Sequence, residues 1–297
     1  MTYSIVARDA ETGELGVAVQ SHWFSVGSIV TWGRTGVGAV ATQSIAEPAY
    51  GPRLLDRLAV GETPAAALKV ELAADERGRF RQVAAVDGAG RVAAYTGESC
   101  IPFAGHVEGD GFSAQANMMA SEEVWPAMAR GFEAAEGPLA RRLVAALDAA
   151  EAAGGDVRGR QSAALLVVPA EGEPWRRTVE LRVEDHPDPL AELRRLVDLR
   201  EAYDLADEAD ELASAGRFDE AGERGQRALE LAPHNAELMF WAGLGLAQHG
   251  QVDRGVALVR RAIDLHAGWA DLLRQLSHEI APGAQAVREA LTLDRSS

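Results

Sequence analysis

Thr2 is the residue whose type and position point most directly to chemistry. If Met1 is removed, Thr2 carries a hydroxyl and a free α-amine on the same residue. An α-amine has an ordinary pKa of about 7.7–8.0, so near neutral pH it can accept the proton of its own hydroxyl. This is the N-terminal threonine form of an activated nucleophile, which needs no separate histidine. The alternative is that a small second residue serves only the removal of methionine.

Asn117 is a second polar candidate. It ends the run Gly111-Phe112-Ser113-Ala114-Gln115-Ala116-Asn117, which we predict to be a polar segment between the strands and a helical middle region. A side-chain amide can donate a hydrogen bond to the oxyanion of a tetrahedral intermediate. Alternatively, the amide only satisfies the backbone of its own loop.

Two arginines and a glutamine follow a predicted turn at Gly154-Gly155-Asp156 and precede a predicted strand. Arg158 and Arg160 can bind a substrate carboxylate through paired hydrogen bonds, with Gln161 beside them. That arrangement suits a ureido acid or an amino-acid amide. The alternative is that the arginines form ion pairs with Asp156 or Asp9 and hold a loop in place.

Other motifs in the chain are weaker indications of function. Cys100 and His106 are a conceivable cysteine and histidine couple, but a lone cysteine is more often a small buried apolar residue. The run Gly36–Ala41 matches the dinucleotide pattern G-x-G-x-x-A, yet it falls within a predicted strand. The seven histidines show no metal-binding spacing. We therefore expect no metal and no cofactor.

Composition excludes several classes of protein. The chain has 297 residues, with 45 acidic and 29 basic side chains and a net charge of -16, so it repels nucleic acids. One cysteine cannot build a disulfide framework. No stretch approaches the roughly 18 apolar residues of a membrane span, and the N-terminus does not resemble a signal peptide. We expect a cytoplasmic homo-oligomer that binds neither nucleic acid nor membrane.

Hydrophobic periodicity predicts an α+β domain over residues 1–185. The predicted strands are Thr2–Asp9, Leu15–Ser21, Val37–Thr42, Val83–Val86, Arg91–Thr96, Ala163–Val168 and Arg177–Val183. Between them, Gly51–Ala74 and Ser121–Ala153 have helical periodicity and many alanines.

The remainder of the chain is predicted to be helical. Residues 186–200 form a linker at Pro187-Asp188-Pro189 and an amphipathic helix, Leu190–Arg200. Residues 201–297 carry a spacing typical of tetratricopeptide repeats. The matching positions are Gly216-Arg217-Phe218, Ala221, Ala228 and Pro233, followed 34 residues on by Gly250-Gln251-Val252, Gly255 and Ala262. A generic bundle of helical hairpins is the alternative.

Several runs of the first domain resemble one protein family. These runs are Thr2–Asp9, Gly13–Val19, Gly36–Gln43, Ala49–Arg53 and Gly155–Leu165. In this order they closely resemble the DUF1028 family, a branch of the Ntn-hydrolase superfamily. The resemblance implies a four-layer αββα sandwich and hydrolysis of an amide bond by an N-terminal nucleophile.

The resemblance also suggests which residues surround Thr2. Proteasome-like members of the superfamily place an acidic residue on the second strand and a lysine on the third. This chain offers Arg34 in the third region, and Lys69 is its only lysine. An arginine stabilises an anion or lowers the pKa of the amine, but it cannot act as a base. We assign Thr2, Ser21, Arg34 and Asn117 to catalysis, and Gln20, His22, Gln43, Arg158, Arg160 and Gln161 to substrate binding.

Two functions follow from these features. The first is an amidohydrolase that acts on a small amide or ureido substrate through Thr2 after Met1 is removed. The second is a catalytically inactive scaffold of the same fold, whose helical repeats bind a protein or peptide partner.

Overall fold

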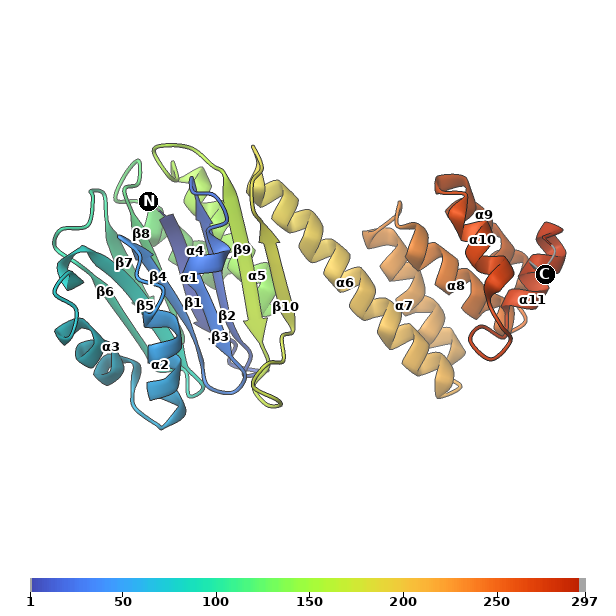
Figure 1. Ribbon diagram of the computed structural model, residues 1–297, viewed down its shortest axis with the longest axis horizontal. Coiled ribbons are helices and arrows are strands. Elements are labelled where there is room, and N and C mark those ends of the chain that lie inside the picture. The colour runs from blue at the N-terminus through green and yellow to red at the C-terminus, as the bar shows by residue number, and fades with distance from the viewer. Residues whose placement is uncertain (1, 294–297) are drawn as a thin grey trace. The chain divides into compact units, whose positions relative to one another are not determined.

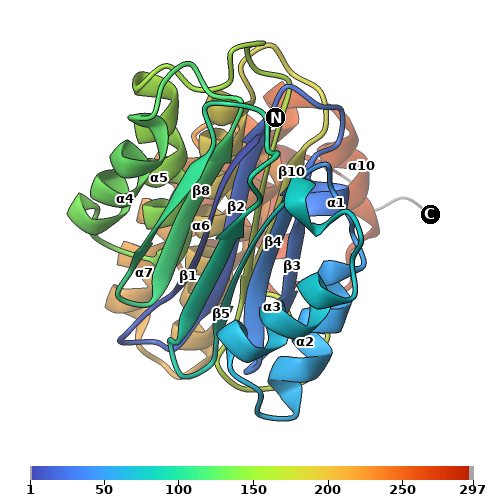
Figure 2. The same ribbon diagram turned by 90° about the vertical axis from the view of Figure 1, so that its left-hand side faces the viewer.

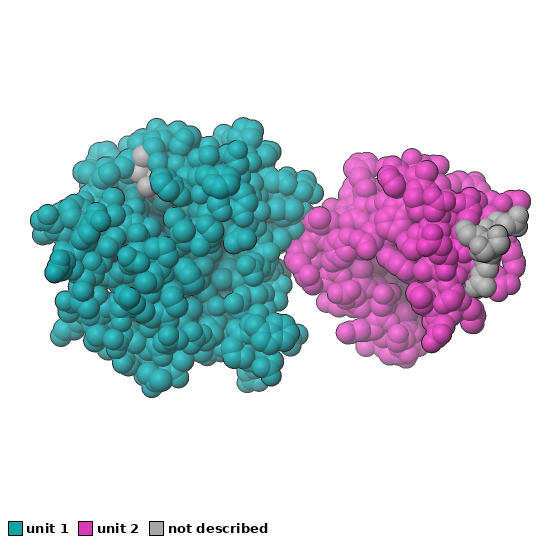
Figure 3. Space-filling view, viewed as in Figure 1, with its two compact units in different colours: residues 1–197 teal, residues 198–297 magenta. Residues whose placement is uncertain are grey.

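The computed structural model describes residues 2–293, which form two compact units (Figure 3). The first unit is Met1–Val197 and the second is Asp198–Ser297. Within the described residues, all strands lie in the first unit, and the second unit is helical. This confirms the α+β class and the helical C-terminal region expected from the sequence.

A six-stranded antiparallel sheet carries Thr2 on one of its central strands (Figure 1). The strand order is β10-β9-β2-β1-β8-β7. The strands are β1 (Thr2–Arg8), β2 (Leu15–Ser21), β7 (Gly105–Gly109), β8 (Phe112–Asn117), β9 (Ser162–Val168) and β10 (Val179–Val183). In the register of β1, Thr2 lies opposite Asn117 of β8, and Tyr3 lies opposite Gln20 of β2.

A second, four-stranded antiparallel sheet lies against the first. Its strand order is β3-β4-β5-β6. The strands are β3 (Thr31–Arg34), β4 (Gly38–Ser44), β5 (Arg81–Asp87) and β6 (Val92–Thr96). The pairing of β4 with β5 places Gln43 opposite Gln82.

Helices cover the outer faces of both sheets (Figure 2). The helices α4 (Val124–Ala134) and α5 (Leu139–Ala152) pack on the first sheet. The helices α2 (Tyr50–Ala59) and α3 (Pro64–Ala73) pack on the second. Two short elements, α1 (Gly27–Val30) and the 3-10 helix η1 (Gly78–Phe80), lead into β3 and β5.

The layer between the two sheets is apolar at one end and polar at the other. Side chains along a strand alternate between its two faces, so the residues of β1 that face the second sheet are Thr2, Ser4 and Val6. Val6 joins an apolar cluster that includes Val17 and Ala84. Thr2 and Ser4 are buried polar residues at the other end. The sandwich therefore encloses a polar site at the start of β1.

The second unit consists of helices joined by short turns. They are the end of α6 (Pro189–Ser214), then α7 (Phe218–Leu231), α8 (Ala236–Gln248), α9 (Val252–Leu265), α10 (Gly268–Gln275) and α11 (Ala284–Leu291). α8 packs closely on α9, since a Cβ on Gly243 would lie 2.7 Å from the carbonyl oxygen of Gly255. No helix in residues 2–293 is long and apolar enough to cross a membrane.

Two helices of this unit, α7 and α9, begin 34 residues apart. α7 and α9 each have 14 residues. Both follow a glycine with positive φ, Gly216 at 77° and Gly250 at 82°, and these glycines are the two predicted from the 34-residue spacing. α6 runs without interruption from Pro189 to Ser214, so it includes the predicted helix Leu190–Arg200 and extends past the predicted boundary at residue 200.

The structure differs from the sequence prediction at several elements. Gly51–Ala74 forms two helices, because Gly61 has a φ of 90° and Thr63 caps a new helix by accepting a hydrogen bond from the Ala66 amide. Ser121–Ala153 likewise divides into α4 and α5. The segment that ends in Asn117 is a buried strand, β8, and the short strands β3 and β7 were not predicted.

Candidate functional site

Thr2 lies buried at the first position of β1, with 5% of its surface exposed. Its side chain faces the second sheet, and its hydroxyl donates a hydrogen bond to the Ser21 hydroxyl across 3.1 Å. Ser21 is the last residue of the neighbouring strand β2. The structure therefore brings the hydroxyl of Ser21, one of the residues predicted to be catalytic, to the hydroxyl of Thr2. Met1 lies outside the described residues.

Gln43 holds the backbone of Thr2 from the opposite sheet. Its Nε2 atom donates to the carbonyl oxygen of Thr2 across 3.3 Å and to Oε1 of Gln82 across 2.7 Å. Its Oε1 atom accepts a hydrogen bond from the Ser4 hydroxyl across 2.7 Å. Gln43 was predicted to bind substrate, and here its amide binds β1.

Asn117 holds the same carbonyl group from within the first sheet. Its Nδ2 atom donates to the carbonyl oxygen of Thr2 across 3.3 Å and to Oε1 of Gln82 across 2.9 Å. Both hydrogens of this amide are thereby used, since an amide nitrogen carries two. Asn117, which was predicted to be catalytic, lies beside Thr2. Its donation to an oxyanion would require one of these bonds to break.

Gln82 is the residue that the sequence analysis missed. Its Oε1 atom accepts the hydrogen bonds of Gln43 and Asn117, and its Nε2 atom donates to the Thr96 hydroxyl across 2.9 Å and to the Ala116 carbonyl across 2.9 Å. The side chain is fully buried. The sequence contained a signal for this position. Gln82 and Ala84 are two residues apart on β5, so their side chains lie on the same face of the strand.

Hydroxyl and amide groups extend this network through the layer between the sheets. The Gln115 amide donates to the Ser4 hydroxyl across 2.7 Å, and the Ser113 hydroxyl donates to Gln115 across 3.0 Å. At the other edge, Thr96 shares a hydrogen bond with Nδ1 of His106 across 2.8 Å. Apart from the His106 ring, the network consists of amides, hydroxyls and backbone carbonyl groups.

The alternation of a strand separates Gln20 from Thr2. Gln20 immediately precedes Ser21, so its side chain lies on the opposite face of β2, toward the helices α4 and α5. It is fully buried, and its amide atoms have no hydrogen-bond partner among the described residues. His22 is exposed just beyond the strand, where its backbone amide donates to Asp156. Gln20 is therefore not placed to contact a substrate at Thr2.

Arg34 lies far from Thr2, contrary to the expectation from the sequence. It ends β3 and pairs with Gly38, at the opposite end of β4 from Gln43. Its guanidinium forms an ion pair with Asp56 of α2 across 2.7 Å, on the outer face of the second sheet. The helix packed on that face supplies the carboxylate, so Arg34 is not placed to act on the Thr2 amine or on an anion beside it.

The loop that precedes β9 contains the three remaining predicted residues. Arg158 forms an ion pair with the buried carboxylate of Asp156 across 3.0 Å, as in the structural alternative considered from the sequence. Arg160 lies within 3.4 Å of Glu151 and 3.3 Å of Asp188. The Gln161 backbone amide donates to the carbonyl of Ser21 across 3.2 Å. These contacts hold the loop beside the end of β2.

Three non-glycine residues near the polar end of the sandwich have positive φ angles. They are Ser25 at 55°, Ser44 at 75° and Met118 at 59°. Ser44 directly follows Gln43, and Met118 directly follows Asn117. Such conformations cost free energy and cluster at functional sites. Their position beside both residues that bind the Thr2 carbonyl marks this end of the sandwich as the candidate site.

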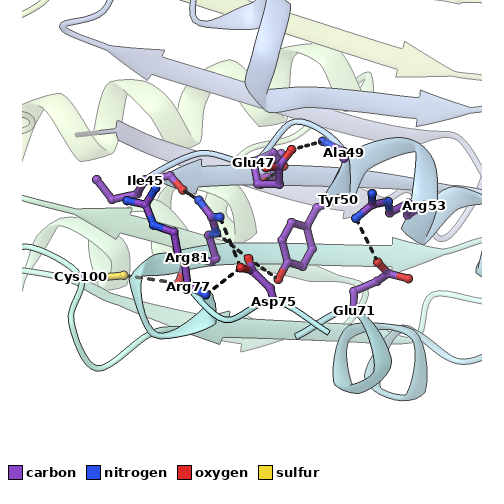
Figure 4. A network of polar contacts seen from close by, with 11 residues as sticks. Ile45, Glu47, Ala49, Tyr50, Arg53, Glu71, Asp75, Arg77, Arg81 and Cys100 are labelled. Carbon is purple, nitrogen blue, oxygen red and sulfur yellow. Dashed lines mark hydrogen bonds and ion pairs between the residues drawn. The ribbon is translucent and has the colours of Figure 1, made fainter. Parts of the chain in front are cut away.

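A second network holds the start of β5 from the outer side of its sheet (Figure 4). The guanidinium of Arg81 forms an ion pair with Asp75 across 2.7 Å and donates to the carbonyl oxygen of Ile45. Tyr50 donates to the same carboxylate across 3.1 Å. The hydrogen bond from Arg81 lowers the pKa of Asp75, and burial raises the pKa of Tyr50. Because Arg81 precedes Gln82, this network positions the residue that joins the sheets.

Cys100 belongs to this outer network. Its thiol lies 3.4 Å from the carbonyl oxygen of Arg81, whereas the His106 ring bonds Thr96. The two side chains therefore have separate partners and no couple is formed. Within residues 2–293, no group of three or more His, Cys, Asp and Glu side chains is arranged to hold a metal ion.

Comparison with known proteins places this region in a family. The family model described as "Family of unknown function (DUF1028)" matches residues 2–193. The chain belongs to the DUF1028 family. The DUF1028 region includes Thr2 and the whole network around it, and it ends before the helical unit begins at Asp198.

A solved structure of the same family is similar to this chain. It is the crystal structure of protein SPO2555 from Silicibacter pomeroyi, which also carries the DUF1028 description. The two proteins are 35% identical, with a TM-score of 0.61, over 66% of this chain and 87% of that chain. A search of the curated proteins finds none that matches this chain.

Replacing Gln82 tests whether its amide joins the sheets. Gln82→Leu keeps the size of the side chain but leaves the amides of Gln43 and Asn117 without their shared acceptor. We expect the free energy of unfolding in urea to fall by about 2–4 kcal/mol. The control is Gln161→Leu, whose amide contacts Asp185 at the surface and whose loss costs under about 1 kcal/mol. Equal effects of the two substitutions would show that Gln82 is not the joining residue.

The ion pair of Asp75 with Arg81 predicts a pH dependence of stability. The pKa of Asp75 is lower in the folded chain than in the unfolded chain, so its contribution is complete above pH of about 4 and is lost as the pH falls below that value. Asp75→Asn should lower the free energy of unfolding by about 2–4 kcal/mol at pH 7, with a smaller difference from wild type at pH 3. A difference that does not change with pH would contradict the ion-pair explanation.

Proposed function

We propose that this protein is an amidohydrolase of the Ntn type, in which Thr2 is the nucleophile once Met1 has been removed. The single observation that carries the proposal is the position of Thr2, which starts a central strand with its carbonyl group held from both sheets. The order of layers, with helices on the outer faces of two packed sheets, is the one expected for an Ntn-hydrolase sandwich.

The network supports this function by fixing the nucleophile. Gln43 and Asn117 both bind the carbonyl oxygen of Thr2, while Ser21 accepts the hydrogen bond of its hydroxyl. A nucleophile whose backbone and side chain are both held loses little entropy on reaching the transition state. The surrounding amides and hydroxyls do not ionise near neutral pH. The proton acceptor in this proposal is therefore the α-amine of Thr2 itself.

The proposed reaction has two steps. In the first, Thr2 Oγ1 bonds to the carbonyl carbon of the amide, and the hydroxyl proton passes to the α-amine and then to the departing amine. The products are an ester on Thr2 and a free amine. In the second, water attacks the ester carbon, the α-amine takes the proton of the water and returns it to Oγ1, and the carboxylic acid leaves. The substrate class in this proposal is a small amide or ureido acid.

Substitution at position 2 tests the proposal. In a preparation whose intact mass shows loss of Met1, we expect hydrolysis within a panel of small amides and ureido acids. Thr2→Ala should lower the rate by at least about 10³-fold, as removal of a nucleophile does, while Thr2→Ser retains measurable turnover. The rate should rise with pH through the pKa of the amine, ordinarily about 7.7–8.0.

A matched control separates the amine from the hydroxyl. Extending the N-terminus by two residues keeps the Thr2 hydroxyl but converts its amine into an amide, so turnover should be lost. Acylation of Thr2 by a β-lactone, detected as an increase in intact mass, provides a readout that does not require the natural substrate. Equal acylation or turnover in the extended chain would exclude the N-terminal mechanism. Complete retention of Met1 would do the same.

The alternative proposal is a scaffold in which the first unit has no activity and the helical unit binds a partner. The observation that favours it is an open groove in the helical unit, lined by four helices. The internal 34-residue repeat supports a tetratricopeptide-like unit within this alternative. Absence of turnover and of acylation in a chain that lacks Met1 would favour the scaffold.

A further inference from the structure

A groove of about 730 Å³ lies within the second unit. It is lined by the end of α6 and by α7, α8 and α9, together with the turn around Ile280 (Figure 1 labels these helices). Its volume falls in the range of ligand-binding sites in proteins. All the residues that line it belong to the second unit and lie outside the DUF1028 match.

Small residues leave the floor of the groove open. Gly222 and Gly225 of α7 and Gly245 of α8 line it, and a Cβ built on any of the three would meet no atom within 4 Å. Glycine inside a helix costs about 1 kcal/mol relative to alanine. Three such positions on one groove, with no packing neighbour that excludes a side chain, leave space for an extended chain to lie against the helices.

Aromatic side chains form part of the groove wall. Trp241 is 39% exposed and Phe218 is 49% exposed, and both line the groove. The Phe218 ring packs on the ring of His249, with 4.5 Å between their centroids. Tryptophan and arginine are enriched at the centres of binding interfaces.

The charges in the groove distinguish it from the rest of this acidic chain. Arg254 and Arg261 of α9 line it, and neither forms an ion pair with a carboxylate in the described part of the chain. Arg254 instead donates to the amide oxygen of Gln251 across 2.6 Å. Several other arginines of the unit do pair with carboxylates. Among these pairs are Arg200 with Asp204, Arg217 with Glu220, Arg224 with Glu208, Arg227 with Glu230 and Arg274 with Asp271.

One carboxyl group also lines the groove, that of Asp210 on α6. Burial, with a smaller effect of Asp207, raises the pKa of Asp210 and so disfavours its charged form. Two arginines and one aspartate thus line the groove, in a chain whose overall net charge is -16. The groove is complementary to a negatively charged ligand.

From the groove's open floor, its aromatic wall and its two uncompensated arginines, we infer that it binds an extended acidic peptide segment of a partner protein. Arg254 and Arg261 are seven residues apart, which is two helical turns or about 10.5 Å along α9. In an extended peptide of polyproline II conformation, residues three apart lie on the same face and are separated by about 9 Å. The ligand therefore carries carboxylates at every third position, with apolar residues between them that contact Trp241.

A labelled peptide tests this inference on the full chain. The probe is fluorescein-labelled Glu-Leu-Ala-Glu-Leu-Ala-Glu, and its partner has glutamine in place of each glutamate. Fluorescence anisotropy should show saturable binding of the acidic peptide and at least tenfold weaker binding of the glutamine peptide. The dissociation constant of the acidic peptide should rise with salt, as expected for contacts between charges. Thr2→Ala should bind it normally, because this inference does not depend on catalysis.

Two substitutions and a matched control locate the site. Arg254→Gln and Arg261→Gln should each raise the dissociation constant at least fivefold, since each removes a charged hydrogen-bond donor. Arg260→Gln should change it less than twofold, because Arg260 has the same charge on the same helix but does not line the groove. Equal effects of Arg260→Gln and Arg261→Gln would overturn the inference, as would equal binding of the two peptides or no saturable binding.

Filling the groove provides an independent test. Gly245→Leu places a side chain where no atom lies within 4 Å and improves helix propensity, so the fold should be kept. Its thermal unfolding should match or exceed that of the wild type, while binding of the acidic peptide is lost. Unchanged binding in a folded Gly245→Leu chain would contradict the location. If wild type self-associates through the groove and Gly245→Leu does not, the occupant is a second copy of the chain and the peptide proposal is wrong.

Discussion

One buried side-chain amide, that of Gln82, joins the two sheets at the end where Thr2 lies. Its oxygen accepts from Gln43 of the second sheet and Asn117 of the first. Both of those amides in turn bind the carbonyl oxygen of Thr2. A buried amide costs free energy unless its hydrogen-bonding groups are satisfied, so this set of bonds is maintained together or lost together. The position of Thr2 therefore depends on a residue of the opposite sheet.

The support for this amide comes from outside the layer between the sheets. Arg81 directly precedes Gln82 and points to the other face of β5, where Asp75 and Tyr50 complete an ion-pair network. The same guanidinium binds the carbonyl oxygen of Ile45, in the loop that follows Gln43 and Ser44. Consecutive residues of one strand thus serve two tasks. Arg81 anchors the start of β5 and the loop that contains Ile45, and Gln82 joins the two sheets.

The two units carry separate chemistry. Around Thr2 the network is composed mainly of neutral amides and hydroxyls, which orient a backbone and do not ionise near neutral pH. In the helical unit, two arginines without carboxylate partners in the described residues line an open groove. The DUF1028 match covers the first region and ends at residue 193. A DUF1028 region is therefore joined in this chain to a helical unit with a charged groove of its own.

The sequence by itself determined the α+β class, the DUF1028 membership, the start of β1 at Thr2 and the 34-residue period of the helices. These depend on local features, namely alternation, helical periodicity, turn glycines and long motifs in a fixed order. Three of the residues that it assigned to catalysis or substrate binding, Ser21, Gln43 and Asn117, lie beside Thr2. Only the tertiary structure decided the rest. Gln82 gains its role from partners on other strands, and Arg34 loses its expected one because α2 packs a carboxylate beside it. Gln20 and Ser21 are adjacent on β2, but their side chains lie on opposite faces of the strand, and only that of Ser21 contacts Thr2. The pairing of distant strands, rather than a local pattern, decides which residues lie against each face.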